Sequence, residues 1–300
     1  MNKNNRARVP CTEARGNGSK KGETAMKQSC QALFVLTFVY VGVFSLSSLV
    51  PLPWVGVLLE VAAVGAALLV SRRTLLCKAA PEDVGIGFSL RPILPSLPLL
   101  PLFLALVIGL SLGCEALGSL VGYDGAYDYG DSFWLCLLTS ALLPAVTEEL
   151  FCRYVFLRRL TPYSPMGAVL ASALFFAFLH GNLVQIPYAF VAGVLLGGLA
   201  VASGSVLPGM LFHFANNALS ISLHFFGGGV FGVLLPYLLA LACLVGLTLL
   251  LVFRRRYAVG VRRLLERREL TSAQAVGQVL ASPCLIFLLI FAVQAVLRGV

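Results

Sequence analysis

The chain has 300 residues, of which 59% are hydrophobic and only 12% are charged. Soluble globular proteins are about half apolar and about a quarter charged, so this composition excludes an ordinary soluble protein. The 29 glycines and 15 prolines fit a protein that crosses a membrane several times, because neighbouring helices satisfy the backbone groups that these residues free. The net charge of +9 is therefore interpreted as a topology signal, and no nucleic-acid partner is expected.

Long apolar runs predict the membrane spans, because a helix of about 17 to 25 residues crosses the hydrocarbon core of a bilayer. In chain order the predicted spans are Cys30–Val50, Trp54–Val70, Pro101–Gly122, Phe133–Leu160, Met166–His180, Val184–Ala202, Pro208–Phe226, Val230–Phe253 and Leu280–Leu297. The predicted fold class is thus an all-α, polytopic transmembrane helix bundle of eight to nine spans. The lower count follows if the first two runs form a re-entrant hairpin.

Basic residues predict the orientation, because cytoplasmic segments carry an excess of Lys and Arg. This rule places the N-terminal tail and the segments 71–92, 158–165, 203–207 and 254–279 in the cytoplasm. The connections on the other side contain aspartates but no Lys or Arg. We therefore expect an integral, multi-pass membrane protein with a cytoplasmic N-terminus, located in the plasma membrane if the protein is bacterial.

Two segments between spans have an unusual composition. Residues 254–279 mix Arg with Leu and Val at helical spacing, which predicts either an amphipathic segment on the anionic inner leaflet or a simple topology anchor. Pro92, Pro95, Pro98 and Pro101 repeat every three residues. There we expect an extended or interfacial segment rather than the interior of a helix.

Ionisable side chains within membrane spans are costly, and they are candidate functional residues by default. Three predicted spans carry such residues. The fourth contains Glu148-Glu149-Leu150-Phe151-Cys152-Arg153, the fifth ends at His180, and the seventh contains His213 and Asn217, four residues apart.

The two adjacent glutamates point about 100° apart on a helix and cannot share one role. Glu149 precedes Arg153 by four residues, which is the favourable order for an ion pair on one helix face. We therefore predict a structural pair between Glu149 and Arg153. Glu148 is then assigned to general acid or base chemistry.

Spacing along the chain predicts the depth of these groups in the membrane. If the fourth and fifth spans form an antiparallel hairpin, Glu148 and His180 differ in depth by about one residue, or about 1.5 Å. His213 and Asn217 lie within about two helical turns of the same level and share one face of their helix. These four side chains can therefore converge on one cavity. A Glu and a His that activate water, with a His and an Asn that stabilise an oxyanion, form a hydrolytic arrangement.

The three motifs resemble those of the CAAX-processing and bacteriocin-processing (CPBP, or Abi) family of intramembrane proteases. That family carries EExxxR, FxxxH and HxxxN or HxxxD motifs on successive membrane helices. This chain has Glu148–Arg153, Phe176–His180 and His213–Asn217 in that order, within about residues 130–225. The resemblance implies that Glu148 and His180 activate water, that His213 and Asn217 stabilise the oxyanion, and that Glu149 and Arg153 support the site.

Four segments are predicted from these features: a disordered basic tail (1–28), N-terminal transmembrane helices (29–129), a catalytic core (130–226) and C-terminal transmembrane helices (227–300). The expected substrate is a membrane-associated protein or peptide, either lipidated in the manner of a CAAX protein or embedded in the lipid bilayer. No cofactor is expected. The alternative is a divalent metal such as zinc at Glu148, His180 and His213, although the sequence has no HExxH motif.

Two other classes of function remain open. A non-catalytic membrane scaffold, or an immunity factor against bacteriocins, could use the same fold. A proton-coupled transporter would also place Glu and His within the membrane, but the sequence shows no inverted repeat.

Overall fold

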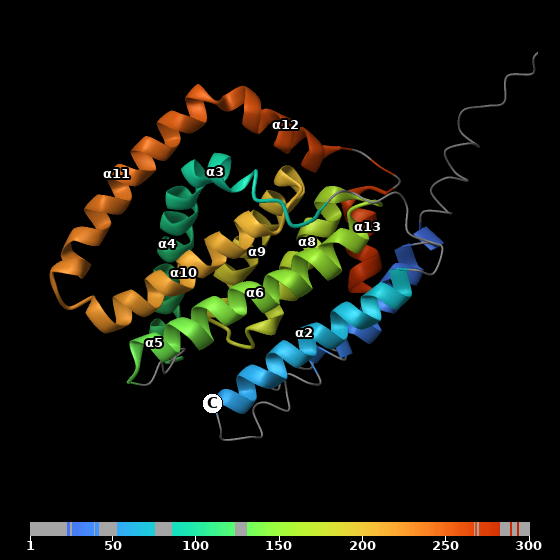
Figure 1. Ribbon diagram of the computed structural model, residues 1–300, viewed down its shortest axis with the longest axis horizontal. Helices are drawn as coiled ribbons and strands as arrows, with labels where there is room; N and C mark the ends of the chain where they lie inside the picture. Colours follow the sequence, from blue (N-terminus) through green and yellow to red (C-terminus); the bar gives the residue numbers. More distant parts are fainter. Residues whose placement is uncertain are drawn as a thin grey trace, which may run out of the picture.

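A computed structural model of the protein describes residues 23–24, 26–38, 40–41, 53–75, 86–123, 131–266, 268, 270–282, 289 and 293. Within these residues the secondary structure is helical apart from an isolated bridge between Gly87 and Ser205, which confirms the predicted all-α class. Figure 1 shows long helices packed side by side, with α11 and α12 arching along one edge of the bundle.

The predicted spans within the described residues coincide with helices to within a few residues. The long helices are α2 (Pro53–Leu75), α4 (Leu100–Leu120), a continuous stretch Phe133–Leu160, α8 (Pro165–Leu179), α9 (Gln185–Ser203), α10 (Leu207–Phe226) and α11 (Val230–Val252). Two shorter helices follow, α12 (Arg254–Leu265) and α13 (Ser272–Leu280). Of the predicted span Cys30–Val50, residues 30–38 and 40–41 are described and are helical, whereas the span Leu280–Leu297 lies largely outside the described residues.

Four helices in the described part of the chain are long and apolar enough to cross a membrane, judged by length and composition: Ile93–Leu120, Phe133–Leu160, Gln185–Ser203 and Val230–Val252. α8 is apolar but has only 15 residues. α10 has 20 residues and is not among the four, because its His, Asn and Ser side chains make it less hydrophobic. The protein is an integral membrane protein, and the count of eight to nine spans is not confirmed.

The proline repeat is helical, so the expectation of an extended segment is wrong. Residues 93–96 form α3, residues 97–99 form the 3₁₀ turn η1, and α4 begins at Leu100. Pro95, Pro98 and Pro101 each lie in the first turn of one of these helices. The N–H groups of a first turn have no acceptor within the helix, so proline, which lacks an N–H, loses no hydrogen bond there. The neighbouring donors are satisfied, since Ser96 N donates to Pro92 O at 3.1 Å. Pro95, Pro98 and Pro101 therefore lie within the span Ile93–Leu120, and Pro92 immediately precedes it.

The predicted end of the disordered tail at residue 28 also needs correction. Residues 23–24 and 26–28 are helical, and Met26 is fully buried in the main hydrophobic core. Gln274 of α13 donates to Glu23 Oε1 at 3.4 Å. These contacts with distant parts of the chain order residues that look polar and unstructured in the sequence. Residues 1–22 of the predicted tail lie outside the described residues.

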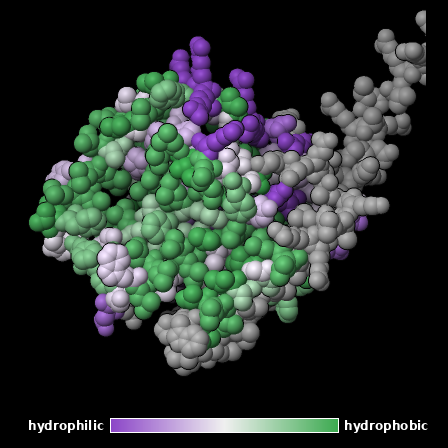
Figure 2. Space-filling model, in the orientation of Figure 1, coloured by the Kyte–Doolittle hydropathy of each residue, from purple (hydrophilic) through white to green (hydrophobic). Residues whose placement is uncertain are grey.

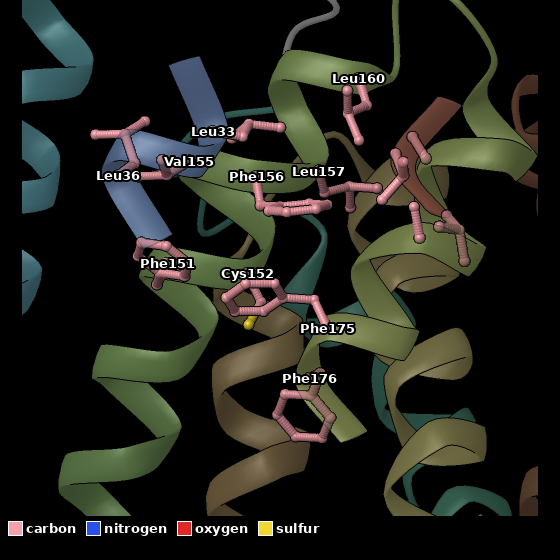
Figure 3. Packing of buried hydrophobic residues seen from close by; sticks show 14 of the residues in the cluster. Leu33, Leu36, Phe151, Cys152, Val155, Phe156, Leu157, Leu160, Phe175 and Phe176 are labelled. Atoms are coloured by element: carbon pink, nitrogen blue, oxygen red, sulfur yellow. The ribbon is translucent and has the colours of Figure 1, made fainter. Parts of the chain in front are cut away.

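The main hydrophobic core joins the N-terminal helical residues to the helices that carry the first two motifs. Tyr40 stacks on Phe151, with ring centroids 4.3 Å apart. The Phe175 ring lies 5.3 Å from that of Phe151 and 5.0 Å from that of Phe156. Figure 3 shows Leu33 and Leu36 beside Phe151 and Val155 in the same core. This packing fixes the position of the first motif relative to α8.

The stretch Phe133–Leu160 alternates between α- and π-helical geometry. It consists of α5 (Phe133–Cys136), the π segment η2 (Leu137–Leu142), α6 (Leu143–Glu149), the π segment η3 (Leu150–Leu157) and α7 (Arg158–Leu160). π-Helical turns are rare and often occur at functional sites. A carbonyl in each π segment accepts a hydrogen bond from another helix: Asn217 Nδ2 donates to Ser140 O at 3.2 Å, and Ser172 Oγ donates to Cys152 O at 2.8 Å. Both bonds tie the first motif helix to the helices of the other two motifs.

The turn between α9 and α10 sets the start of the helix that carries the third motif. Gly204 has φ of +69°, a conformation that favours glycine. Residues 86–90 dock against this turn, with Gly87 N donating to Gly204 O at 3.0 Å. Ser205 Oγ donates to Ser89 O at 2.9 Å and accepts from Ser89 N at 3.1 Å. These bonds hold both ends of the turn and so fix the start of α10.

The outer surface is strongly apolar, as expected for a protein in lipid. Along α11, Val230 is 74% exposed and Tyr237 is 72% exposed. Figure 2 shows a broad hydrophobic face, with hydrophilic residues gathered at the end of the molecule where α12 lies. An apolar surface of this extent requires a nonpolar environment.

Candidate functional site

Glu149 lies at the centre of the polar cluster, between Arg153 and His213. Its Oε2 is 3.3 Å from Arg153 Nε, and its Oε1 is 3.3 Å from His213 Nδ1. Glu149 and Arg153 are completely buried, and His213 is 4% exposed. The predicted Glu149–Arg153 ion pair is therefore present, and it extends to a third residue on α10. One carboxylate thus links the EExxxR and HxxxN motifs.

Two glycines let the neighbouring helices come close enough for these contacts. A Cβ at Gly209 of α10 would lie 2.9 Å from Glu149 Oε2, so a larger residue would displace the carboxylate. Arg153 Nη2 donates to the carbonyl of Gly193 on α9 at 3.3 Å. At Gly193 itself, an added Cβ would lie 3.0 Å from Ala173 Cα of α8. Arg153 therefore reaches a backbone acceptor that close glycine packing presents to it.

The Phe176 ring holds the three motifs together. Its centroid lies 4.9 Å from the ring of His180 and 5.4 Å from the ring of His213, in edge-on geometry with both. The Arg153 guanidinium carbon lies 4.5 Å above the same ring, which is a cation–π contact. The first residue of the FxxxH motif thus packs against a residue from each of the other two motifs.

The hydrogen bond of His180 determines which of its nitrogens carries the proton. His180 Nδ1 lies 2.8 Å from the carbonyl oxygen of Phe176. A carbonyl can only accept, so Nδ1 carries the hydrogen, and in the neutral ring Nε2 has the lone pair. Gly181 follows with φ of +57° and ends α8 at this point. His180 therefore presents a proton acceptor at the end of its helix.

His213 is also held through Nδ1, but by a carboxylate rather than by a backbone carbonyl. Its Nδ1 faces the carboxylate of Glu149. If Nδ1 donates to that carboxylate, a neutral ring has no hydrogen on Nε2, because neutral imidazole carries a single N–H. His213 can donate from Nε2 to a bound group only when both nitrogens carry hydrogen. With Nδ1 as the donor, the two histidines share one neutral tautomer and differ in the acceptor, which is a backbone carbonyl for His180 and a carboxylate for His213.

Asn217 is one turn beyond His213 on the same face of α10, as its spacing predicts. Its Nδ2 donates to Ser140 O, and its Oδ1 accepts from Asn216 Nδ2 at 3.2 Å. The amide nitrogen has a second hydrogen that these two contacts do not use. Ser140 and Asn216 therefore fix which way the Asn217 amide faces.

Glu148 lies one residue before Glu149 in α6, is half-buried, and has a buried Oε2. The structure thus joins Glu149, Arg153, His180 and His213 through contacts with one another or with Phe176. Asn217 lies on the same face of α10 as His213 and contacts Ser140 and Asn216. Glu148 occupies the helix position next to Glu149. The carboxylate that faces His213 is that of Glu149.

The residues of the alternative zinc site do not form a metal-binding cluster. Among the described residues, no three His, Cys, Asp or Glu side chains are arranged so that they could hold a metal ion. Glu148, His180 and His213 therefore do not fit the three-ligand zinc site that was the alternative. We derive no chemical step through a metal.

Sequence reasoning missed the residues that support the cluster: Ser140, Gly193, Gly209 and Asn216. Two of them leave a signal in the sequence. Gly209 precedes His213 by four residues and so shares its face, and Gly193 begins a GxxxG pattern with Gly197. Ser140 acts through its backbone carbonyl, which no side-chain pattern can reveal.

Comparison with known protein families gives a match over residues 130–219 to the Rce1-like family, described as Type II CAAX prenyl endopeptidase Rce1-like. The matched segment contains all three motifs and every residue of the polar cluster. Neither the curated proteins nor the solved structures include a match to the chain. The match to the Rce1-like family confirms the resemblance to the CAAX-processing and bacteriocin-processing proteases that the three motifs of this chain predict.

Proposed function

We propose that this protein is an intramembrane endopeptidase that hydrolyses a peptide bond in a membrane-associated substrate. The substrate class we favour is a lipidated, CAAX-like peptide or a membrane peptide. The observation that carries the proposal is the meeting of the three motif helices at Phe176, where His180, His213 and Arg153 contact one ring and Glu149 joins Arg153 to His213.

Water is the nucleophile in this proposal. Glu148 and the lone pair of His180 Nε2 orient a water molecule and take its proton, while the water oxygen attacks the scissile carbonyl carbon. The C=O electron pair moves onto the oxygen. When that pair returns, the C–N bond breaks and the proton passes to the leaving amine. Ser172 is not the nucleophile, because its hydroxyl is fully buried and donates to Cys152 O.

His213 and Asn217 stabilise the oxyanion. The second amide hydrogen of Asn217 is available for the oxyanion, and the amide is already oriented by Ser140. When both of its ring nitrogens carry hydrogen, His213 also donates to the oxyanion from Nε2, while its Nδ1 faces the carboxylate of Glu149. Donors that are fixed before the substrate binds need no reorganisation when the negative charge develops. Glu149 is thus a positioning residue in this scheme, and it does not touch the substrate.

The decisive experiment is cleavage by the purified protein in detergent or nanodiscs. The probes are a farnesylated peptide that ends in a Cys-Ala-Ala-X sequence and an unmodified transmembrane peptide. We expect Glu148→Gln to lower kcat by about 10²- to 10⁴-fold, because the amide cannot accept the proton of water. Glu115→Gln is the matched control, since Glu115 is an exposed carboxylate on α4.

Unchanged turnover in Glu148→Gln would remove Glu148 from the mechanism. The protein acts as a non-catalytic scaffold or immunity factor if two results are obtained together. The wild-type protein cleaves neither probe, and the wild-type protein and Glu148→Gln restore equally a cellular phenotype caused by deleting the gene. Proton-coupled flux into liposomes that Glu148→Gln abolishes would instead indicate a transporter.

A further inference from the structure

The helix α12 lies across the ends of three candidate membrane spans. It begins two residues after the span Val230–Val252. Tyr257 donates from its hydroxyl to Pro95 O at 2.8 Å, and Pro95 is near the start of the span Ile93–Leu120. A Cβ at Gly260 would lie 2.9 Å from Ala202 Cβ, near the end of the span Gln185–Ser203. α12 therefore lies at the level where these spans leave the hydrocarbon core.

One face of α12 is anchored to the protein. At about 100° per residue, Tyr257, Gly260 and Leu264 share this face. They are the partly covered residues of the helix, and Leu264 packs against the main hydrophobic core. Because this face is fixed by a hydrogen bond and by close packing, the directions of the other two faces are fixed as well.

The other two faces are exposed and differ in chemistry. Val261 and Leu265 form an apolar strip next to the anchored face, and they are 50% and 61% exposed. On the far side of the helix lies a basic face of the exposed residues Arg255, Arg256, Arg262 and Arg263, with the exposed Val259 among them. The exposed Arg254, at the start of the helix, projects at the same angle as the apolar strip. A helix at a bilayer surface needs this order of faces, with apolar side chains at the acyl boundary and cations at the headgroups.

Nothing in the described part of the chain neutralises these arginines through an ion pair. The sequence of α12 contains no acidic residue. Glu266 follows directly after it, and the carboxylate of Glu266 pairs with Arg268 at 3.0 Å. Four cations on one face at the end of a membrane helix bundle are therefore open to an anionic partner from outside these residues.

We propose that α12 binds the headgroups of anionic phospholipids at the membrane surface. The basic face contacts the lipid phosphates, and Val261 and Leu265 contact the first part of the acyl chains. Residues 272–280 are excluded from this surface although the sequence places them in the same amphipathic segment. Ala275 and Val279 of α13 are buried, and a Cβ at Gly167 of α8 would lie 2.5 Å from Ala275 Cβ.

The test uses the full-length protein in a neutral detergent, with dioctanoyl phosphatidylglycerol and dioctanoyl phosphatidylcholine as probes. Binding is measured from the shift in Tm as each lipid is titrated. Phosphatidylglycerol should bind at least about tenfold more tightly, because each Arg near a membrane surface contributes about a fivefold preference for anionic lipid. Arg262→Gln/Arg263→Gln should weaken phosphatidylglycerol binding by on the order of twentyfold.

Two controls separate binding of lipid at α12 from general charge attraction and from binding of phosphate alone. Arg91→Gln/Arg268→Gln removes two exposed arginines outside α12 and should leave the affinity for phosphatidylglycerol unchanged. Glycerol 3-phosphate, which has the phosphate without acyl chains, should bind far more weakly than the lipid. Equal affinity for the two lipids, equal loss in the two double variants, or full binding of glycerol 3-phosphate would each overturn the proposal. None of these measurements depends on proteolysis.

Discussion

Glu149 has a structural role because both of its oxygens face charged or polar partners in a fully buried setting. A buried carboxylate is tolerated only when its charge is compensated, and Arg153 provides that compensation. The adjacent Glu148 is half-buried on a different side of the helix. Burial and helix geometry thus distinguish two neighbouring glutamates of identical chemistry, which supports the proposal that Glu149 positions the site and Glu148 is the general base.

This separation predicts different costs for the two glutamates. Glu149→Ala should lower the free energy of unfolding by about 3–5 kcal/mol, because it leaves the guanidinium of Arg153 buried without its counter-charge. The measurement is chemical unfolding in detergent micelles. Glu149→Ala/Arg153→Ala should cost less than the sum of the single variants, by about 0.5–3 kcal/mol. Additive costs, or an equally large loss in Glu148→Ala, would contradict the assigned roles.

At the scale of helices, the site depends on how closely α8, α9 and α10 approach the first motif. Gly193 and Gly197 lie four residues apart on α9 and face Ala173 and Val169 of α8. Without side chains at these positions the two backbones pack closely, which is a common way for membrane helices to associate. The close approach also places the Gly193 carbonyl within reach of Arg153.

The prediction at this scale concerns the glycines of α9. Gly193→Ala should lower the free energy of unfolding by about 1–3 kcal/mol, because the new Cβ meets backbone atoms of Ala173 that cannot move aside. Gly198→Ala is the matched control, since its Cβ would have 3.7 Å to Leu264 Cδ2, which is an ordinary contact. Thermal unfolding of the two variants checks this, and equal Tm values would show that the α8–α9 contact is not tight.

The two ends of the helix bundle differ in charge, because basic residues gather at the end where α12 lies (Figure 2). The basic helix α12 lies near the start of the span Ile93–Leu120 and near the end of α9, as the Tyr257–Pro95 bond and the packing of Gly260 on Ala202 show, and the turn around Gly204 follows the same end of α9. The turn 227–229 lies at the other end of α11. We propose that the α12 end is cytoplasmic, because cytoplasmic segments are rich in Arg and Lys.

Reporter fusions in a bacterial host test this orientation. Alkaline phosphatase fused after Gly228 should be active, because that turn is expected outside the cell. The same reporter fused after Leu265 should be inactive, with the span Val230–Val252 between the two positions. The reverse pattern would invert the orientation, and equal activities would show that α11 does not cross the membrane.

Several features of the fold and the site could be predicted because they depend on residues that are close in the sequence. Hydropathy placed the helix Phe133–Leu160 at the bounds that the structure has. The Glu149–Arg153 pair followed from a spacing of four residues. The helical proline repeat was missed because prolines in the first turns of successive short helices cannot be told from an extended segment by spacing alone.

The sequence by itself determined that this is an all-α membrane protein and which few polar residues are candidates for its chemistry, since composition and motif spacing are local properties. Only the tertiary structure decided that the carboxylate facing His213 is that of Glu149. That contact joins residues 64 positions apart. The contact depends on the rotation of α6 about its axis and on the distance between α6 and α10. Gly209 and the turn at Gly204 set that distance. Neither quantity is encoded in the spacing of residues within one helix.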